Sequence, residues 1–207
     1  MSGPLPAALP EAFYDRPVVD VAPELLGCLV RHGDTVGRIV ETEAYHFSEP
    51  ACHAHAGLTP RTEVLHGPPG MAYVYRSYGI HALLNAVCEP DGIGAAVLIR
   101  ALDPLEGQER MVHRRGRDRD VCNGPGKLTQ ALGIGLELNG TRLDGPVEVL
   151  ARPAGDSEPH VVVGERIGIT RAVELPWRFC DARSASVSSP RPPAMRRRAR
   201  GPRATAG

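Results

Sequence analysis

The sequence predicts an α+β fold, a single domain with a mostly antiparallel curved sheet flanked by short helices. Three observations support this prediction. Strand-like apolar segments recur along the 207 residues and outnumber the helical ones. Residues 72–88 hold two such segments that turn near Tyr78-Gly79, as an antiparallel hairpin does. No repeat or linker divides the chain, and its length suits one core.

In the first part of the chain, Asp20 is expected to cap a short helix over residues 21–26. Residues 28–31 follow as a strand, and residues 37–45, G-R-I-V-E-T-E-A-Y, are a second strand rich in β-branched and aromatic residues. Residues 46–70 are rich in His, Gly and Pro and are expected to be a long loop. Loops of such length inside a domain tend to be functional.

After the hairpin, residues 95–102 are almost all apolar and predict a strand buried on both faces. Residues 103–120 are highly charged and fit either a helix or a mobile loop. A glycine-rich turn then leads into a short helix over residues 127–132. Residues 147–152 and 166–170 are expected to be late strands.

The composition divides the chain into three parts. Residues 1–16 are expected to be an irregular lead-in, and residues 17–183 the folded domain. Residues 184–207 are rich in Ser, Pro and Arg, with six Arg and no acid, and are expected to be a disordered basic tail. Two readings of the tail stay open: non-specific contact with DNA phosphates, or a basic extension without function. The remaining 183 residues carry a net charge of −6, which is weak evidence against a nucleic-acid partner.

The composition also excludes some classes of protein. No run of eighteen apolar residues exists, so no membrane span is expected. The N-terminus is broken by prolines and lacks the basic region of a signal peptide. The five cysteines are scattered without a C-x-x-C pair, which indicates reduced thiols rather than a disulfide framework. The expected location is therefore cytoplasmic.

The strand at residues 37–45 places two acids and an aromatic ring on one face. Side chains alternate across a strand, so Glu41, Glu43 and Tyr45 share a face. Paired acids on a solvated strand are common, but the apolar neighbours argue against full exposure here. A carboxylate at the wall of a cleft can act as general base toward water, a chemistry that glycoside cleavage often needs.

Three of the five tyrosines, Tyr73, Tyr75 and Tyr78, fall within six residues. Tyr73 and Tyr75 share a strand face, which fits core packing or a pocket wall equally well. Tyr78 lies at the expected turn beside a glycine, where packing does not explain an aromatic ring. Rings that stack on bases or insert between base pairs fit this pattern.

Two motifs suggest other chemistry. Four potential metal ligands cluster in the long loop, at His46, Cys52, His53 and His55. Their spacing fits no standard zinc site, so loop histidines that hydrogen-bond are the plainer interpretation. G-P-G-K-L at residues 124–128 lacks the spacing of a phosphate loop, yet its backbone and Lys127 could meet a DNA phosphate.

Nine motifs occur in order between about residues 15 and 180: G-R-I-V-E-T-E-A-Y, T-P-R, G-P-P-G-M-A-Y-V-Y, Y-G-I-H, L-L-N, A-A-V-L-I-R-A-L-D-P-L-E-G, N-G-P-G-K-L-T-Q-A-L-G-I, R-I-G-I and P-W-R-F. Each is weak alone, but together they resemble the alkyladenine (3-methyladenine) DNA glycosylase family, of the monofunctional type found in mammals and many bacteria. The resemblance covers nearly the whole body of the chain.

The resemblance implies roles for residues at matching positions. Glu43 corresponds to the general base that activates water for attack at the sugar C1′, and Arg100 to the arginine that helps to hold that water. Tyr45 and Tyr75 correspond to rings that line the base pocket, with His53 opposite them.

Further positions match outside the catalytic pair. Tyr78 corresponds to the side chain that enters the minor groove in place of the flipped nucleotide. Asn85 corresponds to the pocket asparagine that disfavours guanine, and Lys127 is expected to contact DNA. Glu41 has no such role and is expected to be structural.

The chemistry of these residues agrees with the resemblance. A base inside a duplex must be rotated out before it can be attacked, which is least costly for a damaged base. A lyase would need an amine nucleophile, and Lys127 is the only lysine of the chain. The expected protein is a monomeric glycosylase that needs no cofactor, excises alkylated or deaminated purines from double-stranded DNA, and leaves an abasic site. In a bacterium it is expected to associate with the nucleoid.

The sequence departs from the family's pattern at several positions. The loop before His53 is one residue shorter, which makes His55 an alternative to His53. Thr62 replaces Asn, Leu65-His66 replaces Met-Phe, and Cys180 replaces an aromatic residue. Two rival functions stay open: a binder of damaged DNA without catalysis, and a metal hydrolase built on the loop histidines.

Overall fold

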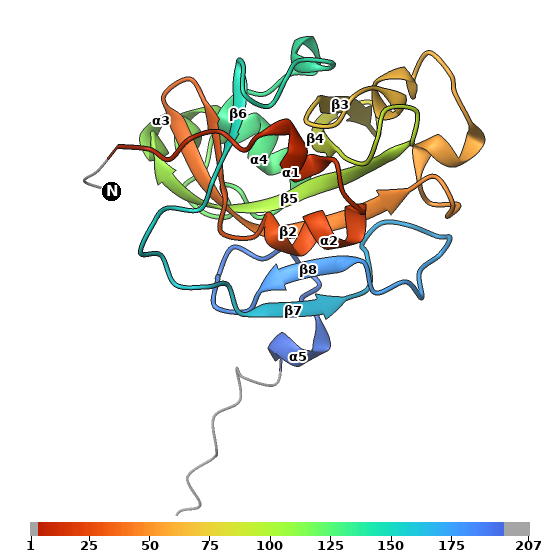
Figure 1. Cartoon of the computed structure of the whole chain (residues 1–207). Helices are drawn as coiled ribbons and strands as arrows, with labels where there is room; N and C mark the ends of the chain where they lie inside the picture. Colours follow the sequence, from red (N-terminus) through yellow and green to blue (C-terminus); the bar gives the residue numbers. More distant parts are fainter. Residues whose placement is uncertain (1–3, 197–207) are drawn as a thin grey trace, which may run out of the picture.

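The computed structural model describes residues 4–196 and has the α+β architecture that the sequence predicts (Figure 1). Within these residues the α-helices are α1 (Glu11–Tyr14), α2 (Val18–Glu24), α3 (Gln108–Arg115), α4 (Pro125–Leu132) and α5 (Pro193–Arg196). Short 3-10 helices are η1 (His53–Ala56), η2 (Glu63–His66) and η3 (Leu136–Leu138). The strands are β1 (Leu29–His32), β2 (Thr35–His46), β3 (Ala72–Ser77), β4 (His81–Val87), β5 (Ala95–Glu106), β6 (Val147–Leu150), β7 (Val161–Gly164) and β8 (Arg178–Asp181).

The strands form one antiparallel sheet, as the predicted fold class requires. The order along the sheet is β3-β4-β5-β2-β1-β6, and β8 pairs with both β2 and β7. The long strands β2 and β5 pair side by side at its centre. The other edge of β2 is shared, because β1 pairs with its first residues and β8 with Glu41–Glu43. Figure 1 shows the result, with β3 and β4 above β5 and with β7 and β8 below β2.

The pairing of β2 with β5 is irregular in the middle of both strands. Ile39 pairs with Leu102, Glu41 with Ala101 and Thr42 with Ile99. Val40 is therefore an extra residue on β2, and Arg100 is an extra residue on β5, as in a β-bulge. Bulges re-aim side chains, and this one lies at the strand segment that holds the two acids.

The main core lies between the sheet and helices α2 and α4. α2 packs on β2 and β5, and α4 packs on β4 and β5. Leu128 and Leu132 of α4 are fully buried, and each such side chain contributes roughly 1.5–3 kcal/mol through burial. α4 begins after Gly124 with Pro125 in its first turn, and it ends at Gly133 with φ +75.

Several predicted elements are confirmed and others were wrong. The hairpin, the apolar strand and the helix before Gly133 are present. Residues 166–170 form no strand, because Arg166 turns inward as a buried side chain and Gly168 has φ +78. Asp20 is not a cap, since α2 begins at Val18 after Pro17, whose fixed φ suits a helix start. The lead-in contains helix α1, and the charged segment at 103–120 extends β5 and then forms α3.

The C-terminal segment differs from the expected disordered tail over its described part. Residues 184–196 pack against the body, with Val187 and Met195 buried beside Val40 of β2. The difference arises because this Ser-, Pro- and Arg-rich segment also contains Val187 and Met195. Both side chains pack into the apolar cluster that includes Val40. The prediction for residues 197–207 lies outside the described residues.

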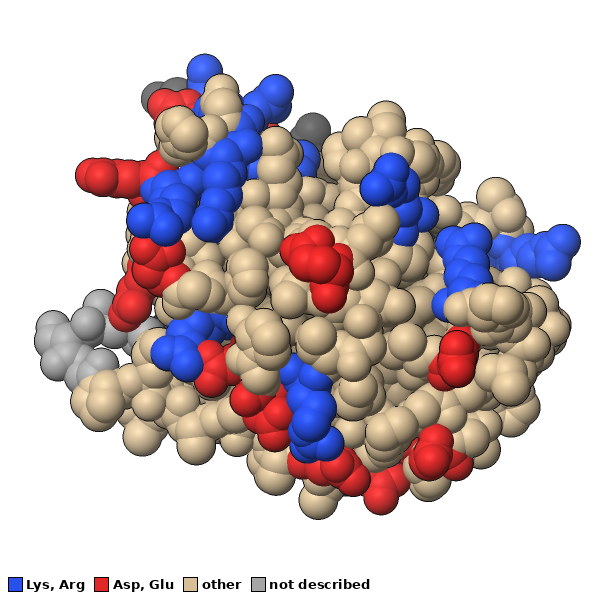
Figure 2. Space-filling view, turned by 90° about the horizontal axis from the view of Figure 1, so that it is seen from above, with Lys and Arg blue, Asp and Glu red and all other residues tan. Residues whose placement is uncertain are grey.

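The face of the molecule shown in Figure 2 carries both basic and acidic side chains. Lys and Arg side chains gather most densely at its upper-left edge, where Asp and Glu side chains stand beside them. Within residues 4–196, no helix is long and apolar enough to span a membrane.

Candidate active site

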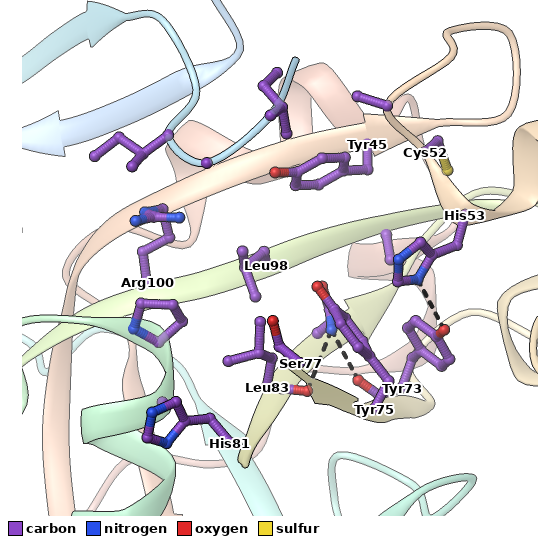
Figure 3. A pocket seen from close by; sticks show the side chains of 18 of the residues that line it. Tyr45, Cys52, His53, Tyr73, Tyr75, Ser77, His81, Leu83, Leu98 and Arg100 are labelled. Carbon is purple, nitrogen blue, oxygen red and sulfur yellow. Dashed lines mark hydrogen bonds between the residues drawn. The ribbon is translucent and has the colours of Figure 1, made fainter. Parts of the chain in front are cut away.

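A cavity of about 820 Å³ opens where the β3–β4 hairpin, β5 and three loops meet. Its volume is in the range of small-molecule sites. The loops are the long one after β2, the one that leads through Gly124 into the first turn of α4, and residues 167–171 after β7. The cavity therefore collects residues that lie more than 100 positions apart in the chain. Figure 3 shows Tyr45, His53, Tyr73 and Tyr75 on one side and Arg100 and His81 on another.

Aromatic rings form one wall of this cavity. Tyr73 and Tyr75 share a face of β3, as predicted, and their ring centroids lie 5.3 Å apart at an interplanar angle of 29°. The ring of His53 stands edge-on to Tyr75, with centroids 4.6 Å apart. Nδ1 of His53 and the Tyr73 hydroxyl are 3.0 Å apart, within hydrogen-bond distance (Figure 3). A flat apolar ligand such as a base can stack in a slot of this kind.

The histidine of this wall is neutral at physiological pH. Burial and the nearby Arg61 guanidinium lower the pKa of His53 to about 4. Nε2 of His53 lies 3.3 Å from Nη2 of Arg61, which fits an unprotonated nitrogen that accepts. Burial also raises the pKa of Tyr75 to about 12, so its hydroxyl stays protonated.

Glu43 lies directly behind the cavity wall. Its side chain is fully buried. Oε1 accepts a hydrogen bond from the Ile167 backbone N–H at 2.7 Å. Oε2 accepts from the Tyr45 hydroxyl at 2.8 Å and from Arg100 Nη1 at 3.2 Å. All three donor residues line the cavity, whereas Glu43 itself does not.

The charge state of Glu43 reflects opposing effects. Burial raises its pKa above the ordinary value, and the Glu41 charge adds to the increase. The Arg100 charge, the Ile167 N–H and the Tyr45 hydroxyl oppose it, but burial prevails. A carboxylate with a raised pKa is a stronger base than an exposed glutamate, which suits proton abstraction from water.

Arg100 joins the two acids. Its Nε donates to Glu41 at 3.1 Å and its Nη1 to Glu43 at 3.2 Å. Burial lowers the pKa of Arg100, but the two carboxylates outweigh burial and the pKa is raised, so the guanidinium is charged. The predicted shared face of Glu41, Glu43 and Tyr45 agrees with these contacts, whereas a solvated strand face does not.

Three more predicted residues lie on the cavity wall. Tyr78 is at the turn of the hairpin with φ +50 and is 86% exposed. Asn85 is buried on β4, and its Nδ2 donates to the carbonyl of Tyr73 at 3.0 Å. Lys127 is in the first turn of α4 and donates to Asn123 Oδ1 at 2.7 Å. The structure thus brings Tyr45, His53, Tyr75, Tyr78, Asn85, Arg100 and Lys127 to one cavity, with Glu43 behind it.

The loop histidines do not converge on one point. His55 Nδ1 lies 2.9 Å from the carbonyl of Phe47, and His46 Nδ1 lies 2.6 Å from Ser48 Oγ. The Cys52 thiol donates to the carbonyl of Gly94. Among residues 4–196, no group of three or more His, Cys, Asp or Glu side chains is placed to hold a metal ion.

Sequence reasoning missed several residues of the site. Arg61, in the T-P-R motif, lies over the Tyr75 ring at 5.6 Å from its centroid. Ile167 supplies a backbone N–H, which no side-chain pattern reveals. Arg166 fixes that segment, because Nη1 donates to Glu49 at 2.6 Å and to the carbonyl of Ala44 at 2.9 Å. The sequence signals for these residues are the T-P-R motif for Arg61 and the R-I-G-I motif for Arg166 and Ile167, whose composition predicts a strand.

Comparisons with known proteins give consistent results. Residues 12–185 match the family model described as methylpurine-DNA glycosylase (MPG). A Rhodopseudomonas palustris protein named "Putative 3-methyladenine DNA glycosylase" is 51% identical over 192 residues, which is 92% of this chain and 91% of that protein. Proteins with the same printed name from Nitrobacter winogradskyi (52% identical, 88% of each chain) and Methanoculleus marisnigri (51% identical, 83% of this chain and 93% of that one) also match.

Proposed function

Because the chain belongs to the methylpurine-DNA glycosylase family, we propose that it hydrolyses the N-glycosidic bond of a flipped-out purine nucleotide with water activated by Glu43. Family membership makes the chain a DNA glycosylase of alkylation repair, a hydrolase that acts on DNA. The observation that carries the mechanistic proposal is a single buried carboxylate held by three residues of the cavity wall, Tyr45, Arg100 and Ile167.

The hydrogen bonds of Glu43 leave room for one more donor. An ionised carboxylate has about four acceptor positions, and the described donors occupy three of them. In our proposal, substrate binding loosens the contact with Arg100, and a water enters between Arg100 and Glu43. Catalytic hydrogen bonds commonly rearrange between the free and bound states of an enzyme. Glu43 then takes a proton as the water oxygen attacks C1′, and the base leaves with the bonding electrons.

The aromatic wall supplies the binding energy for the flipped base. Stacking on aromatic rings contributes roughly 1–3 kcal/mol per base, which offsets the few kcal/mol that unstacking a damaged base costs. A neutral His53 does not repel a cationic alkylated purine, and it can also accept a neutral, deaminated one. Both are therefore proposed substrates, with Asn85 restricting the space at one edge of the base.

The proposed reaction leaves an abasic site with the strand intact. Strand cleavage would need an amine that forms a Schiff base with the sugar. Lys127 is the only lysine, and its Nζ donates to Asn123 at the rim of the cavity. We propose instead that Lys127 and the first turn of α4 contact a DNA phosphate, and that the protein acts as a monomer.

The direct test is excision from duplex oligonucleotides that carry hypoxanthine or ethenoadenine. Wild-type protein is expected to produce alkali-labile sites, and the Glu43→Gln variant is not. Tight binding of the damaged duplex without alkali-labile sites would instead support a protein that binds damage without catalysis.

The excision rate is expected to decrease as the solution becomes acidic, and the decrease should occur at a pH above the ordinary glutamate pKa of 4.5. The reason is that burial raises the pKa of Glu43. The ionised form is the base, so activity is lost as pH decreases through this raised value. Protonation of a group whose pKa is raised by folding favours the folded state. Loss of the base, rather than unfolding driven by Glu43, therefore causes the decline.

This pH dependence is measured as single-turnover excision rates, with circular dichroism at each pH to confirm folding. A rate that stays constant down to the ordinary glutamate pKa, in folded protein, would contradict the assignment of Glu43 as the base.

Replacing Tyr78 with asparagine is expected to slow excision from duplex DNA without loss of stability. Tyr78 is 86% exposed with φ +50, and asparagine tolerates this left-handed conformation. The ring that would fill the gap left by the flipped nucleotide is lost, so roughly 1–3 kcal/mol of stacking disappears. The Tyr78→Phe variant keeps the ring and is the matched control. Equal rates for the Asn and Phe variants would exclude the insertion role.

A further inference from the structure

The C-terminal segment reaches the acids behind the active site. The family model match ends at residue 185, yet the described chain continues and returns to β2. Ser188 is buried and donates two hydrogen bonds to Glu41, from its backbone N–H to Oε2 at 2.7 Å and from its hydroxyl to Oε1 at 2.9 Å.

Glu41 accepts hydrogen bonds from several distant parts of the chain. Its Oε1 also accepts from Arg100 Nε at 3.1 Å and from Arg178 Nε at 2.7 Å. Arg178 in turn donates to the carbonyls of Ser188 at 3.1 Å and Pro190 at 2.9 Å. One fully buried carboxylate thus connects β5, β8 and the C-terminal segment.

The buried charges balance as a set of four. Glu41 and Glu43 carry two negative charges, and Arg100 and Arg178 carry two positive ones. Each side chain is 7% exposed or less. Arg178 contacts only Glu41 of the two acids, whereas Arg100 contacts both. The charge of Arg100 is therefore divided between Glu41 and Glu43, and the division depends on how strongly Glu41 is held by Arg178 and Ser188.

The orientation of the Arg100 side chain also depends on Glu41. Arg100 is the extra residue of the β5 bulge, so strand pairing alone does not orient it. Its Nε is anchored on Glu41 and its Nη1 on Glu43. Within residues 4–196, no hydrogen-bond acceptor is placed for Nη2, and Arg100 lines the cavity (Figure 3). Nη2 is thus available to water or substrate.

We propose that Glu41 is a positioning residue for the glycosylase reaction, which aims Arg100 into the cavity and limits how much of its charge Glu43 receives. The Ser188 segment completes the hydrogen bonds of Glu41 and thereby belongs to the active site. This inference rests on the proposed function of Glu43 as the base.

Two substitutions in this set should shift the pH dependence of excision in opposite directions. Glu41→Gln removes a negative charge that raises the pKa of Glu43 and leaves Arg100 to pair with Glu43 alone. The acid-side decline of excision should then move to lower pH, and the maximal rate should fall roughly 10- to 100-fold because Arg100 loses its anchor. Arg178→Gln removes a positive charge, so Glu41 draws Arg100 toward itself and the decline should move to higher pH.

The experiment measures single-turnover excision across pH with the full chain, on a duplex carrying hypoxanthine. Binding of the same duplex and the thermal midpoint of each variant are measured in parallel. Glu148→Gln is the matched control. Glu148 on β6 forms an ion pair with Arg31 on β1, and neither residue lines the cavity. We expect opposite shifts for Glu41→Gln and Arg178→Gln, unchanged duplex binding, and wild-type behaviour for Glu148→Gln.

Wild-type rates and pH profiles in both variants, with Glu43→Gln inactive, would overturn the role of Glu41 and leave the proposed function intact. Wild-type excision by Glu43→Gln would overturn both. If Glu41→Gln does not fold, Arg178→Gln and Ser188→Ala test the inference instead. Ser188→Ala removes one donor to Glu41 without changing any charge, so it should slow excision and move the acid-side decline to higher pH by less than Arg178→Gln does. An unchanged rate would exclude the segment.

Discussion

Replacing Glu43 with glutamine is expected to reduce excision of a damaged purine by roughly 10²- to 10⁴-fold, the usual contribution of a general base. Glutamine has the shape of glutamate and can still accept the Ile167 N–H, so the cavity wall should remain in place. The substitution removes the negative charge that pairs with Arg100 and, with it, the ability to take a proton from water. Binding of the damaged duplex should therefore persist while the chemical step is lost.

The measurement combines single-turnover release of the base with a binding titration on the same duplex. Glu148→Gln serves again as the control, since its carboxylate lies outside the cavity wall. A Glu43→Gln protein that excises at the wild-type rate would show that another group activates the water. A wild-type protein that binds the damaged duplex tightly but never releases a base would identify a binder of DNA damage.

Replacing Arg100 with leucine is expected to destabilise the fold by about 3–5 kcal/mol and to abolish excision. Arg100 is 6% exposed and donates to two fully buried carboxylates. Leucine fills part of the space but leaves Glu43 without a cation, and Glu41 with Arg178 alone. An uncompensated buried charge is far more costly than a lost surface ion pair.

Urea unfolding measures this change in the free energy of unfolding. Arg110→Leu is the matched control, since Arg110 pairs with Asp34 at 2.9 Å but both side chains are more than half exposed. Arg110→Leu should lower the free energy of unfolding by less than about 1 kcal/mol. Adding Glu43→Gln to Arg100→Leu should restore part of the lost stability, because one of the uncompensated charges is then gone. Equal costs for the two arginines would contradict the buried-charge argument.

Local patterns predicted the elements whose residues carry their own signals. The hairpin at residues 72–88 has two apolar segments around a turn, and the helix before Gly133 has a proline start and a glycine end. The missed strands β7 and β8 are only four residues long, and β8 lies between β2 and β7. The segment at 166–170 looks like a strand by composition, but burial of the Arg166 guanidinium with Glu49 overrides that preference.

The candidate site, too, was predicted only in part from local patterns of the sequence. Alternation along β2 placed Glu43 and Tyr45 on one face, and the order of motifs pointed to the pocket residues. The position of Glu43 behind the wall was not predictable, because it depends on Ile167 and Arg100 from distant parts of the chain. The same holds for Arg61 over Tyr75, where the motif was visible but the contact was not.

The sequence by itself determined the α+β class, the antiparallel hairpin, the family, and which side chains could do the chemistry. These depend on residue type, periodicity and neighbours within a few positions. Only the tertiary structure decided that Arg100 leaves the ladder of β5 to join two acids, that a backbone N–H caps Glu43, and that the C-terminal segment contacts Glu41. Such features come from register, burial and charge balance among segments more than 50 residues apart, and no local pattern encodes them.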